Sequence, residues 1–231
     1  MLNITNLNFA YGSVQALTDI ELTIPKAEIT CIMGRNGVGK TTLLQNLMGV
    51  LRPASGSIEM DGKNMARWPA HKRVYAGLGL VPQGRHIFPK LTVEENLRIG
   101  LQGRTDGQRR IPENIYDLFP VLKQMSHRRG GDLSGGQQQQ LAIGRALAGD
   151  PKVLLLDEPT EGIQPNIIHH IGKVLQQLVS DMQMTVILVE QYLDFVRDIG
   201  QRVYILDAGQ VVAQTQAGEI SQEMISRHLS V

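Results

Sequence analysis

Short apolar runs alternate with segments of helical periodicity along most of the chain. Glu28–Met33 is a compact apolar run that leads into a glycine-rich turn, and Val153–Leu156 and Thr185–Glu190 are similar runs. Lys40–Leu51 repeats its leucines at helical spacing, and Pro165 can open another helix with apolar positions on one face. Continuous apolar strands are typical of parallel sheets that are covered on both faces. The pattern therefore predicts a doubly wound α/β fold.

Two regions depart from this alternation. Residues 1–30 and Ser57–Asp61 alternate apolar with polar positions, which indicates an antiparallel sheet with one solvent-exposed face. Gln83–Asp132 contains no convincing strand, whereas Thr92 and Glu95 form a capping-box sequence at the start of a helix. These features predict an N-terminal antiparallel β subdomain and a helical insertion into the α/β core.

Length, composition and charge set limits on this picture. We expect the 231 residues to form one domain over residues 1–231, with the helical insertion at about residues 84–140. Hydrophobic residues make up 42% and charged residues 19%, as in ordinary globular proteins, and the net charge of +1 argues against a dedicated nucleic-acid binder. The single cysteine, Cys31, excludes an internal disulfide and fits a reducing compartment. No apolar run reaches the roughly 18–20 residues of a membrane span, and the N-terminus does not resemble a signal peptide, so we expect a cytosolic protein.

The strongest chemical signal is Gly34–Thr41, which reads G-x-x-x-x-G-K-T between the predicted strand and helix. In such a loop, successive backbone N–H groups and a helix N-terminus surround a polyphosphate, which side chains on Cβ atoms would crowd. Lys40 would reach the β- and γ-phosphates of a nucleotide, and the Thr41 hydroxyl would bind Mg²⁺. The alternative is a chance glycine-rich turn. The candidate nucleotide-binding residues here are Gly34, Asn36, Gly37, Gly39, Lys40, Thr41 and Thr42.

A second signal lies at the end of the apolar run Val153–Leu156, where Asp157 and Glu158 follow. A carboxylate at the carboxyl end of a buried strand lies where ligands bind in open α/β sheets. Asp157 could hold the same Mg²⁺ that Thr41 contacts, and Glu158 could orient or deprotonate the attacking water. The alternative is a pair of solvated carboxylates, and it loses weight beside a phosphate loop.

The segment Leu133–Gln137 reads L-S-G-G-Q before a predicted helix and resembles the signature of ABC-type ATPases. Small residues and a hydroxyl at a helix N-terminus form an anion site. The alternative is a plain glycine turn with an N-cap serine. The resemblance implies a head-to-tail dimer that encloses two ATP molecules, in which each signature caps the nucleotide on the second subunit. The residues concerned are Ser134, Gly135, Gly136 and Gln137.

The resemblance covers essentially the whole chain and implies the ABC ATPase variant of the P-loop NTPase fold. Tyr11 matches the family's aromatic residue that stacks on adenine, the alternative being an ordinary core or surface tyrosine. Gln83 matches the glutamine that contacts Mg²⁺ or the water and links the core to the helical insertion, the alternative being a polar loop residue. The basic stretches Arg109–Arg110 and His127–Arg129 are interpreted as solvated faces.

Two positions depart from the family pattern. Gln191 stands where a histidine usually follows the strand after Glu158, and its amide can bond a γ-phosphate but cannot acquire a positive charge. Gln164 replaces the usual aspartate of the loop after Glu158. With glutamine at the histidine position, the chain resembles one of the two ATPase subunits of branched-chain amino acid importers and their relatives. The run Glu161–Pro165 resembles the urea-importer member of that group. The candidate catalytic residues are Glu158 and Gln191.

The resemblance implies ATP hydrolysis, with ATP and Mg²⁺ as cofactors, that drives import of a small polar solute. We expect urea first and branched-chain amino acids second. The implied partners are a second ATP-binding subunit (the same chain or a different one), two integral-membrane permease subunits and, indirectly, an extracytoplasmic solute-binding protein, with no nucleic acid. The subunit would then lie on the cytoplasmic face of a bacterial inner membrane. Two other classes are a soluble ABC ATPase acting on nucleic acid or the ribosome, and a P-loop kinase or GTPase. The L-S-G-G-Q signature and the lack of an N-K-x-D sequence argue against the latter.

Overall fold

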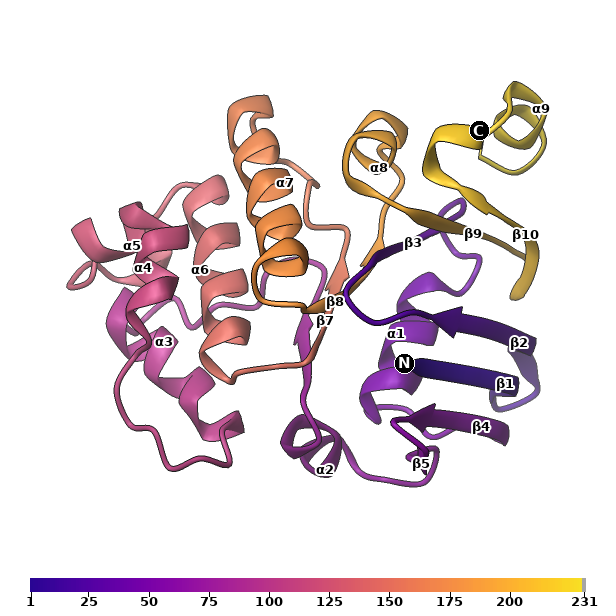
Figure 1. Cartoon of the computed structure of the whole chain (residues 1–231), viewed down its shortest axis with the longest axis horizontal. Coiled ribbons are helices and arrows are strands. Elements are labelled where there is room, and N and C mark those ends of the chain that lie inside the picture. The colour runs from indigo at the N-terminus through magenta and orange to yellow at the C-terminus, as the bar shows by residue number, and fades with distance from the viewer. Residues whose placement is uncertain (230–231) are drawn as a thin grey trace.

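The computed structural model describes residues 1–229 as two β-sheets and a group of helices (Figure 1). The strands are β1 (Leu2–Tyr11), β2 (Val14–Ile24), β3 (Ile29–Met33), β4 (Ser55–Met60), β5 (Lys63–Asn64), β6 (Leu78–Val81), β7 (Val153–Asp157), β8 (Thr185–Val189), β9 (Arg202–Asp207) and β10 (Gln210–Gln216). One sheet has the order β2-β1-β4-β5 and is antiparallel, and the other has the order β10-β9-β3-β8-β7-β6. In this second sheet only the edge strand β10 runs antiparallel to its neighbour. The predicted α/β core and N-terminal antiparallel sheet are therefore confirmed.

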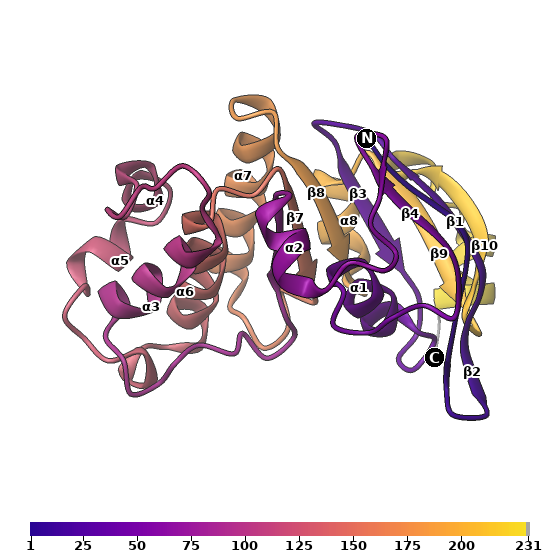
Figure 2. The same ribbon diagram turned by 90° about the horizontal axis from the view of Figure 1, so that it is seen from below.

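Helices lie on both faces of the second sheet. They are α1 (Lys40–Met48), α2 (Ala70–Tyr75), α3 (Val93–Gly100), α4 (Glu113–Leu118), α5 (Pro120–Gln124), α6 (Gly135–Ala148), α7 (Pro165–Ser180), α8 (Leu193–Ile199) and α9 (Gln222–Met224), with a π-helical turn at Ile225–Leu229. Figures 1 and 2 both show α3, α4, α5 and α6 together, on the far side of α7 from the antiparallel sheet. Thr92 and Glu95 form the predicted capping box at the start of α3.

The central strands β7 and β8 are buried on both faces, and alternate residues serve two different cores. In β8, Val186 and Leu188 pack with α6, α7 and α8, whereas Ile187 and Val189 pack with α1 and the antiparallel sheet. This division follows from the two-residue period of a strand. It explains why these strands read as continuous apolar runs, and it places α1 between the two sheets.

Some local features differ from the sequence-based expectation. The predicted helix Lys40–Leu51 ends at Met48, because Gly49 adopts φ +77° and its N–H turns back to the carbonyls of the last turn. The helices α2 and α8 and the edge strand β6 were not predicted. Among residues 1–229, the structure contains no helix with the length and apolar character needed to cross a membrane.

Candidate functional site

A cavity of ≈540 Å³ lies at the carboxyl ends of the core strands, beside the N-terminus of α1. Because β3, β7 and β8 are parallel, the loops that follow them meet at one edge of the sheet. The cavity is lined by Tyr11, Val14, Gln15, Ala16, Asn36, Gly37, Val38, Gly39, Lys40, Thr41, Thr42, Gln83, Glu158, Ala208 and Gly209. Nine of these are residues singled out from the sequence as candidates. The residues from β2 and from the β9–β10 turn were not anticipated.

The loop before α1 requires glycine where it passes closest to other backbone. A Cβ on Gly34 would lie 2.3 Å from the carbonyl oxygen of Leu206, and one on Gly39 would lie 2.9 Å from that of Ala16. Gly39 also has φ +109°, a conformation that other residues rarely adopt. The loop is therefore packed against β2 and β9, with its backbone N–H groups and the start of α1 at the cavity. This arrangement fits a polyphosphate.

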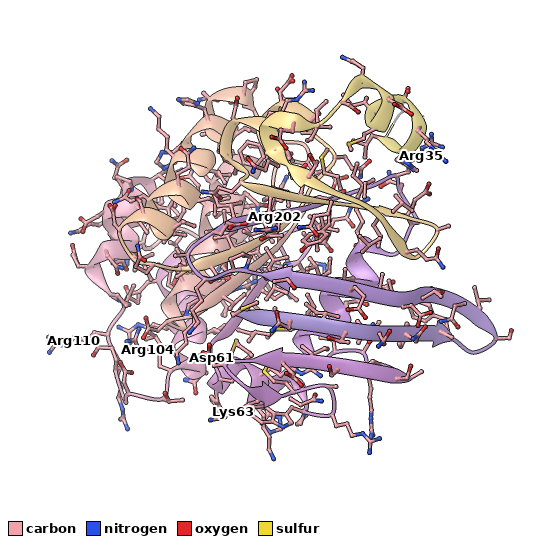
Figure 3. All side chains as sticks on the ribbon, turned by 45° about the vertical axis from the view of Figure 1, so that its right-hand side comes forward. Arg35, Asp61, Lys63, Arg104, Arg110 and Arg202 are labelled. Carbon is pink, nitrogen blue, oxygen red and sulfur yellow. The ribbon has the colours of Figure 1, made fainter. Side chains whose placement is uncertain are left out.

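Lys40 lies inside the curve of this loop. Its Nζ donates to the carbonyl oxygens of Gly34 at 2.9 Å and Arg35 at 2.8 Å, and it lies 3.5 Å from Oε1 of Glu158. The side chain is nearly buried, whereas the neighbouring Arg35 is exposed and lies at the periphery of the molecule (Figure 3). The loop therefore holds the ammonium group of Lys40 in a fixed position at the cavity.

Asp157 ends β7 as a buried carboxylate without a complete set of partners. Its Oδ1 atom has no hydrogen-bond partner. Burial raises the pKa of Asp157, while the Thr41 hydroxyl lowers it by a smaller amount. An orphaned buried carboxylate oxygen beside a hydroxyl is a donor set that suits Mg²⁺. No cluster of three or more His, Cys, Asp or Glu residues that could hold a metal occurs in residues 1–229.

Glu158 lies in the next position with an unusual backbone conformation. Its φ of +48° is uncommon for a residue other than glycine and occurs mostly where the surroundings enforce it. Its backbone N–H donates to the carbonyl oxygen of Val189 at 2.9 Å, and Gln83 Nε2 donates to its Oε2 at 3.2 Å. The same Gln83 amide donates to Oε2 of Glu161 at 3.1 Å, a residue to which the sequence assigned no role. The carboxylate of Glu158 is thereby aimed at the cavity.

Gln191 joins the phosphate loop to Glu158. Its Nε2 donates to Oδ1 of Asn36 at 2.7 Å and to Oε1 of Glu158 at 2.5 Å, so both amide hydrogens are used. Because this residue is a glutamine and not a histidine, an uncharged amide that donates two hydrogen bonds lies between Asn36 and Glu158. Gln164, the other departure, precedes α7 and makes no side-chain capping hydrogen bond.

Tyr11 is half exposed at the rim of the cavity. Its ring packs edge-on against Phe9, with ring centroids 4.8 Å apart, and its hydroxyl lies 3.3 Å from Oγ1 of Thr42. The structure therefore places the Tyr11 ring beside the phosphate loop, at the cavity.

The L-S-G-G-Q segment lies elsewhere. Ser134 caps α6, and it forms a reciprocal capping box with Gln137. A Cβ on Gly135 would lie 3.1 Å from the guanidinium of Arg85, and one on Gly136 would lie 3.1 Å from Ile167. Within the described residues 1–229, none of these signature residues lines the cavity that contains Lys40.

Glu190 is the most conspicuous residue that the sequence reasoning missed. It is 2% exposed and accepts hydrogen bonds from the loops after both β7 and β8. Its position directly after a buried strand is the same signal that singled out Asp157. An acidic residue there, next to Gln191, could have been identified as a site residue on that ground.

Comparisons with known proteins identify the family of the chain and its relatives. A family model described as "ABC transporter" matches residues 17–161. The chain is 41% identical over 214 residues to the high-affinity branched-chain amino acid transport ATP-binding protein BraG of Pseudomonas aeruginosa, covering 92% of this chain and 91% of that protein. It is 35% identical over 223 residues to the probable branched-chain amino acid transport ATP-binding protein LivF of Archaeoglobus fulgidus, covering 95% and 94%. The bacterial ABC transporter cassette MJ0796, solved as a dimer, is similar with a TM-score of 0.86 at 26% identity, covering 94% of this chain and 99% of that one. Another structure of that cassette is a dimeric post-hydrolysis state bound to ADP and Pi.

Proposed function

The chain belongs to the ABC transporter family and is an ABC-type ATPase, and from this premise we propose that it energises the import of branched-chain amino acids. The observation that carries the proposal is the 41% identity to BraG, which extends over 92% of this chain. The similarity to LivF supports the same solute class. The glutamine at position 191, where the family usually has histidine, also supports the proposal. We expect one of the two ATPase subunits of branched-chain amino acid importers to have a glutamine there.

We assign the following roles within this proposal. The loop from Gly34 to Thr42 holds the phosphates, with Lys40 offsetting the charge on the β- and γ-phosphates. Thr41, Asp157 and Gln83 would hold Mg²⁺, which when bound neutralises phosphate charge. Glu158 accepts the proton of the attacking water, for which its carboxylate is held toward the cavity.

Tyr11, Gln191 and the signature Ser134–Gln137 have the remaining roles. Tyr11 stacks on the adenine ring. Gln191 orients Glu158, because its amide spans the phosphate loop and Glu158. A γ-phosphate oxygen would take the place of one of these two acceptors. The signature Ser134–Gln137 would meet the nucleotide of a second subunit, in a head-to-tail pair. Its position away from the cavity and the dimeric MJ0796 cassette support this arrangement.

The partners in the proposal are a second ATP-binding subunit, two membrane permeases and, through them, a solute-binding protein. The subunit would act on the cytoplasmic face of the membrane, with its whole chain as one ATPase domain and the helices after β6 in contact with the permeases. Co-purification from membranes tests this part. Recovery of two polytopic permeases with the chain is expected, and recovery of the chain without them would favour a soluble ABC ATPase.

Urea, the solute that the sequence placed first, becomes the second candidate. It is favoured by the run Glu161–Pro165, whereas the two relatives described above are named for branched-chain amino acid transport. The deciding experiment measures ATP turnover of the transporter in proteoliposomes with its solute-binding protein. Stimulation by leucine, isoleucine or valine, and none by urea, is expected. The reverse pattern would establish urea import.

A further inference from the structure

One buried carboxylate connects the two loops that present Glu158 and Gln191. Oε1 of Glu190 accepts hydrogen bonds from the backbone N–H of Thr160 at 3.0 Å and from its hydroxyl at 2.6 Å. Oε2 accepts from the backbone N–H groups of Gln191 at 2.9 Å and Tyr192 at 3.2 Å. Each oxygen therefore serves one loop, and the carboxylate joins them.

The two loops extend from adjacent strands that are already in register. Asp157 of β7 pairs with Val189 of β8, and the backbone N–H of Glu190 donates to the carbonyl oxygen of Ile32 on β3 at 3.2 Å. Beyond these residues β7 and β8 are no longer paired. The hydrogen bonds to the Glu190 carboxylate then connect the loops that follow the two strands. The distance from Thr160 back to Glu158 is only two residues, and Gln191 directly follows Glu190.

A buried carboxylate is a costly way to join two loops, because desolvation opposes its charge. Burial accordingly raises the pKa of Glu190, while the hydrogen bonds from Thr160, Tyr192 and Gln191 lower it by smaller amounts. A carboxylate has a property that an amide lacks, since both of its oxygens accept. Four donors from two loops can therefore converge on one side chain.

We propose that Glu190 is a positioning residue for ATP hydrolysis, which locks the Glu158 loop to the Gln191 loop so that both side chains meet the γ-phosphate site together. The inference rests on the proposed roles of Glu158 and Gln191. Without the lock, the amide of Gln191 loses its fixed position between Asn36 and Glu158, although the phosphate loop around Lys40 stays intact.

The variant Glu190→Gln tests this with little change of shape. Its side-chain oxygen can serve one loop only, and the N–H of the other loop faces an NH₂ group. We expect kcat for ATP to fall about tenfold or more, as for the loss of a hydrogen bond to a charged group, with an ATP dissociation constant within about twofold of the parent. Turnover is expressed per ATP-binding protein molecule, so that loss of folded protein does not count.

A matched control removes a carboxylate from a different part of the same sheet. Glu28 pairs at 3.0 Å with Arg202, which lies on β9 (Figure 3). The described residues that line the cavity include neither of them. Glu28→Gln is expected to leave kcat unchanged. Thr160→Val, which removes only one donor, is expected to lower kcat less than Glu190→Gln, and Thr160→Ser is expected to restore it.

A double-mutant cycle separates positioning from a general structural role. If Glu190 acts through Gln191, then Glu190→Gln is expected to lower kcat by less than about threefold in a Gln191→Ala background. Equal fold losses in both backgrounds, or undiminished turnover of Glu190→Gln itself, would overturn the proposal.

Amide hydrogen exchange tests the lock independently of turnover. Glu190→Gln is expected to speed exchange at Thr160 or at Gln191 and Tyr192, and unchanged exchange at all three would overturn the lock. A parent protein that binds and hydrolyses no ATP would instead contradict the proposed function, whatever the exchange rates show.

Discussion

Nζ of Lys40 lies 3.5 Å from Oε1 of Glu158, and only 4% and 12% of the two side chains are exposed to solvent. This ion pair joins the phosphate loop to the end of β7 across the floor of the cavity. Each charge is partly balanced by the other, while Lys40 also donates to two loop carbonyls. A nucleotide phosphate that enters the cavity would meet the ammonium group at the point where it now faces Glu158.

Lys40→Ala is expected to lower the affinity for ATP by at least about tenfold to a hundredfold, because charge-assisted hydrogen bonds to phosphate contribute about 1.5–3 kcal/mol. Isothermal titration calorimetry with Mg-ATP measures this loss. Lys26→Ala is the matched control, since Lys26 pairs with the exposed Asp61 away from the cavity. Equal affinities of Lys40→Ala and the parent would contradict the assignment of the phosphate loop.

Glu158→Gln is expected to retain ATP binding but to slow turnover by about 10²–10⁴-fold, since the side chain keeps its shape and loses the ability to accept a proton. The ATP-bound dimer should accumulate and elute earlier in size-exclusion chromatography. Glu59→Gln, an exposed change on β4, serves as control. Turnover at the parental rate would show that Glu158 is not the general base.

The parts of the site that the sequence predicted are those whose signal is local. The loop around Lys40 has a fixed spacing, and Asp157 and Glu158 follow a run of apolar residues that reads as a buried strand. The antiparallel sheet and the parallel core were predictable for a similar reason, because two-residue alternation and continuous apolar runs distinguish half-buried from fully buried strands.

The features that escaped prediction depend on contacts between distant segments. Gln191 meets Asn36 across 155 positions, and no pattern in either segment indicates that contact. The strand β6 is only four residues long and includes Gly79, so its strand character comes from pairing with β7 rather than from its own composition. Glu190 is a buried acidic residue directly after β8. Only the structure shows that Thr160 and Tyr192 donate hydrogen bonds to its carboxylate.

Tyr11→Ala is expected to weaken ATP binding by about fivefold to a hundredfold, because stacking of a base on an aromatic ring contributes about 1–3 kcal/mol. Tyr11→Phe should stay close to the parent, since it keeps the ring that packs on Phe9 and loses only the hydroxyl near Thr42. Fluorescence titration with a labelled ATP analogue provides the comparison. If both variants bind as the parent does, Tyr11 is a surface residue without a role in adenine binding.

Asp157→Asn is expected to raise the melting temperature of the nucleotide-free protein at pH 7. Burial raises the pKa of Asp157 in the folded state. The proton is therefore bound more tightly in the folded than in the unfolded chain, so this group favours folding below its unfolded pKa of about 3.9. That contribution is lost as the pH rises through the folded pKa, and at pH 7 the buried charge opposes folding.

Asparagine carries no such charge, so the gain in stability should be present at pH 7 and fade toward acidic pH. Differential scanning calorimetry over this range, without Mg²⁺ or ATP, measures it, and the exposed change Asp117→Asn is the control. With Mg-ATP the order should reverse, because the parent alone would gain stability from the metal ligand. A lower melting temperature of Asp157→Asn at pH 7 would contradict the prediction.

Gln191→Ala is expected to lower turnover at this subunit's own site about tenfold or more, because it removes hydrogen bonds to the charged Glu158 and to Asn36, and those to a charged group contribute about 1.5–3 kcal/mol. The effect on an assembled transporter depends on the second ATP-binding subunit. If that subunit is this same chain, both sites lose the amide and the transporter should slow as much as the isolated chain does. If it is a different chain with a histidine at the matching position, Gln191→Ala leaves that histidine in place at the other site. Substitution of the histidine should then slow transport-coupled turnover far more than Gln191→Ala does. We expect the second outcome, since importers of this group usually have two distinct ATPases. Turnover of the reconstituted complex, with each subunit substituted in turn, distinguishes them, and equal losses from the two substitutions would rule out unequal sites.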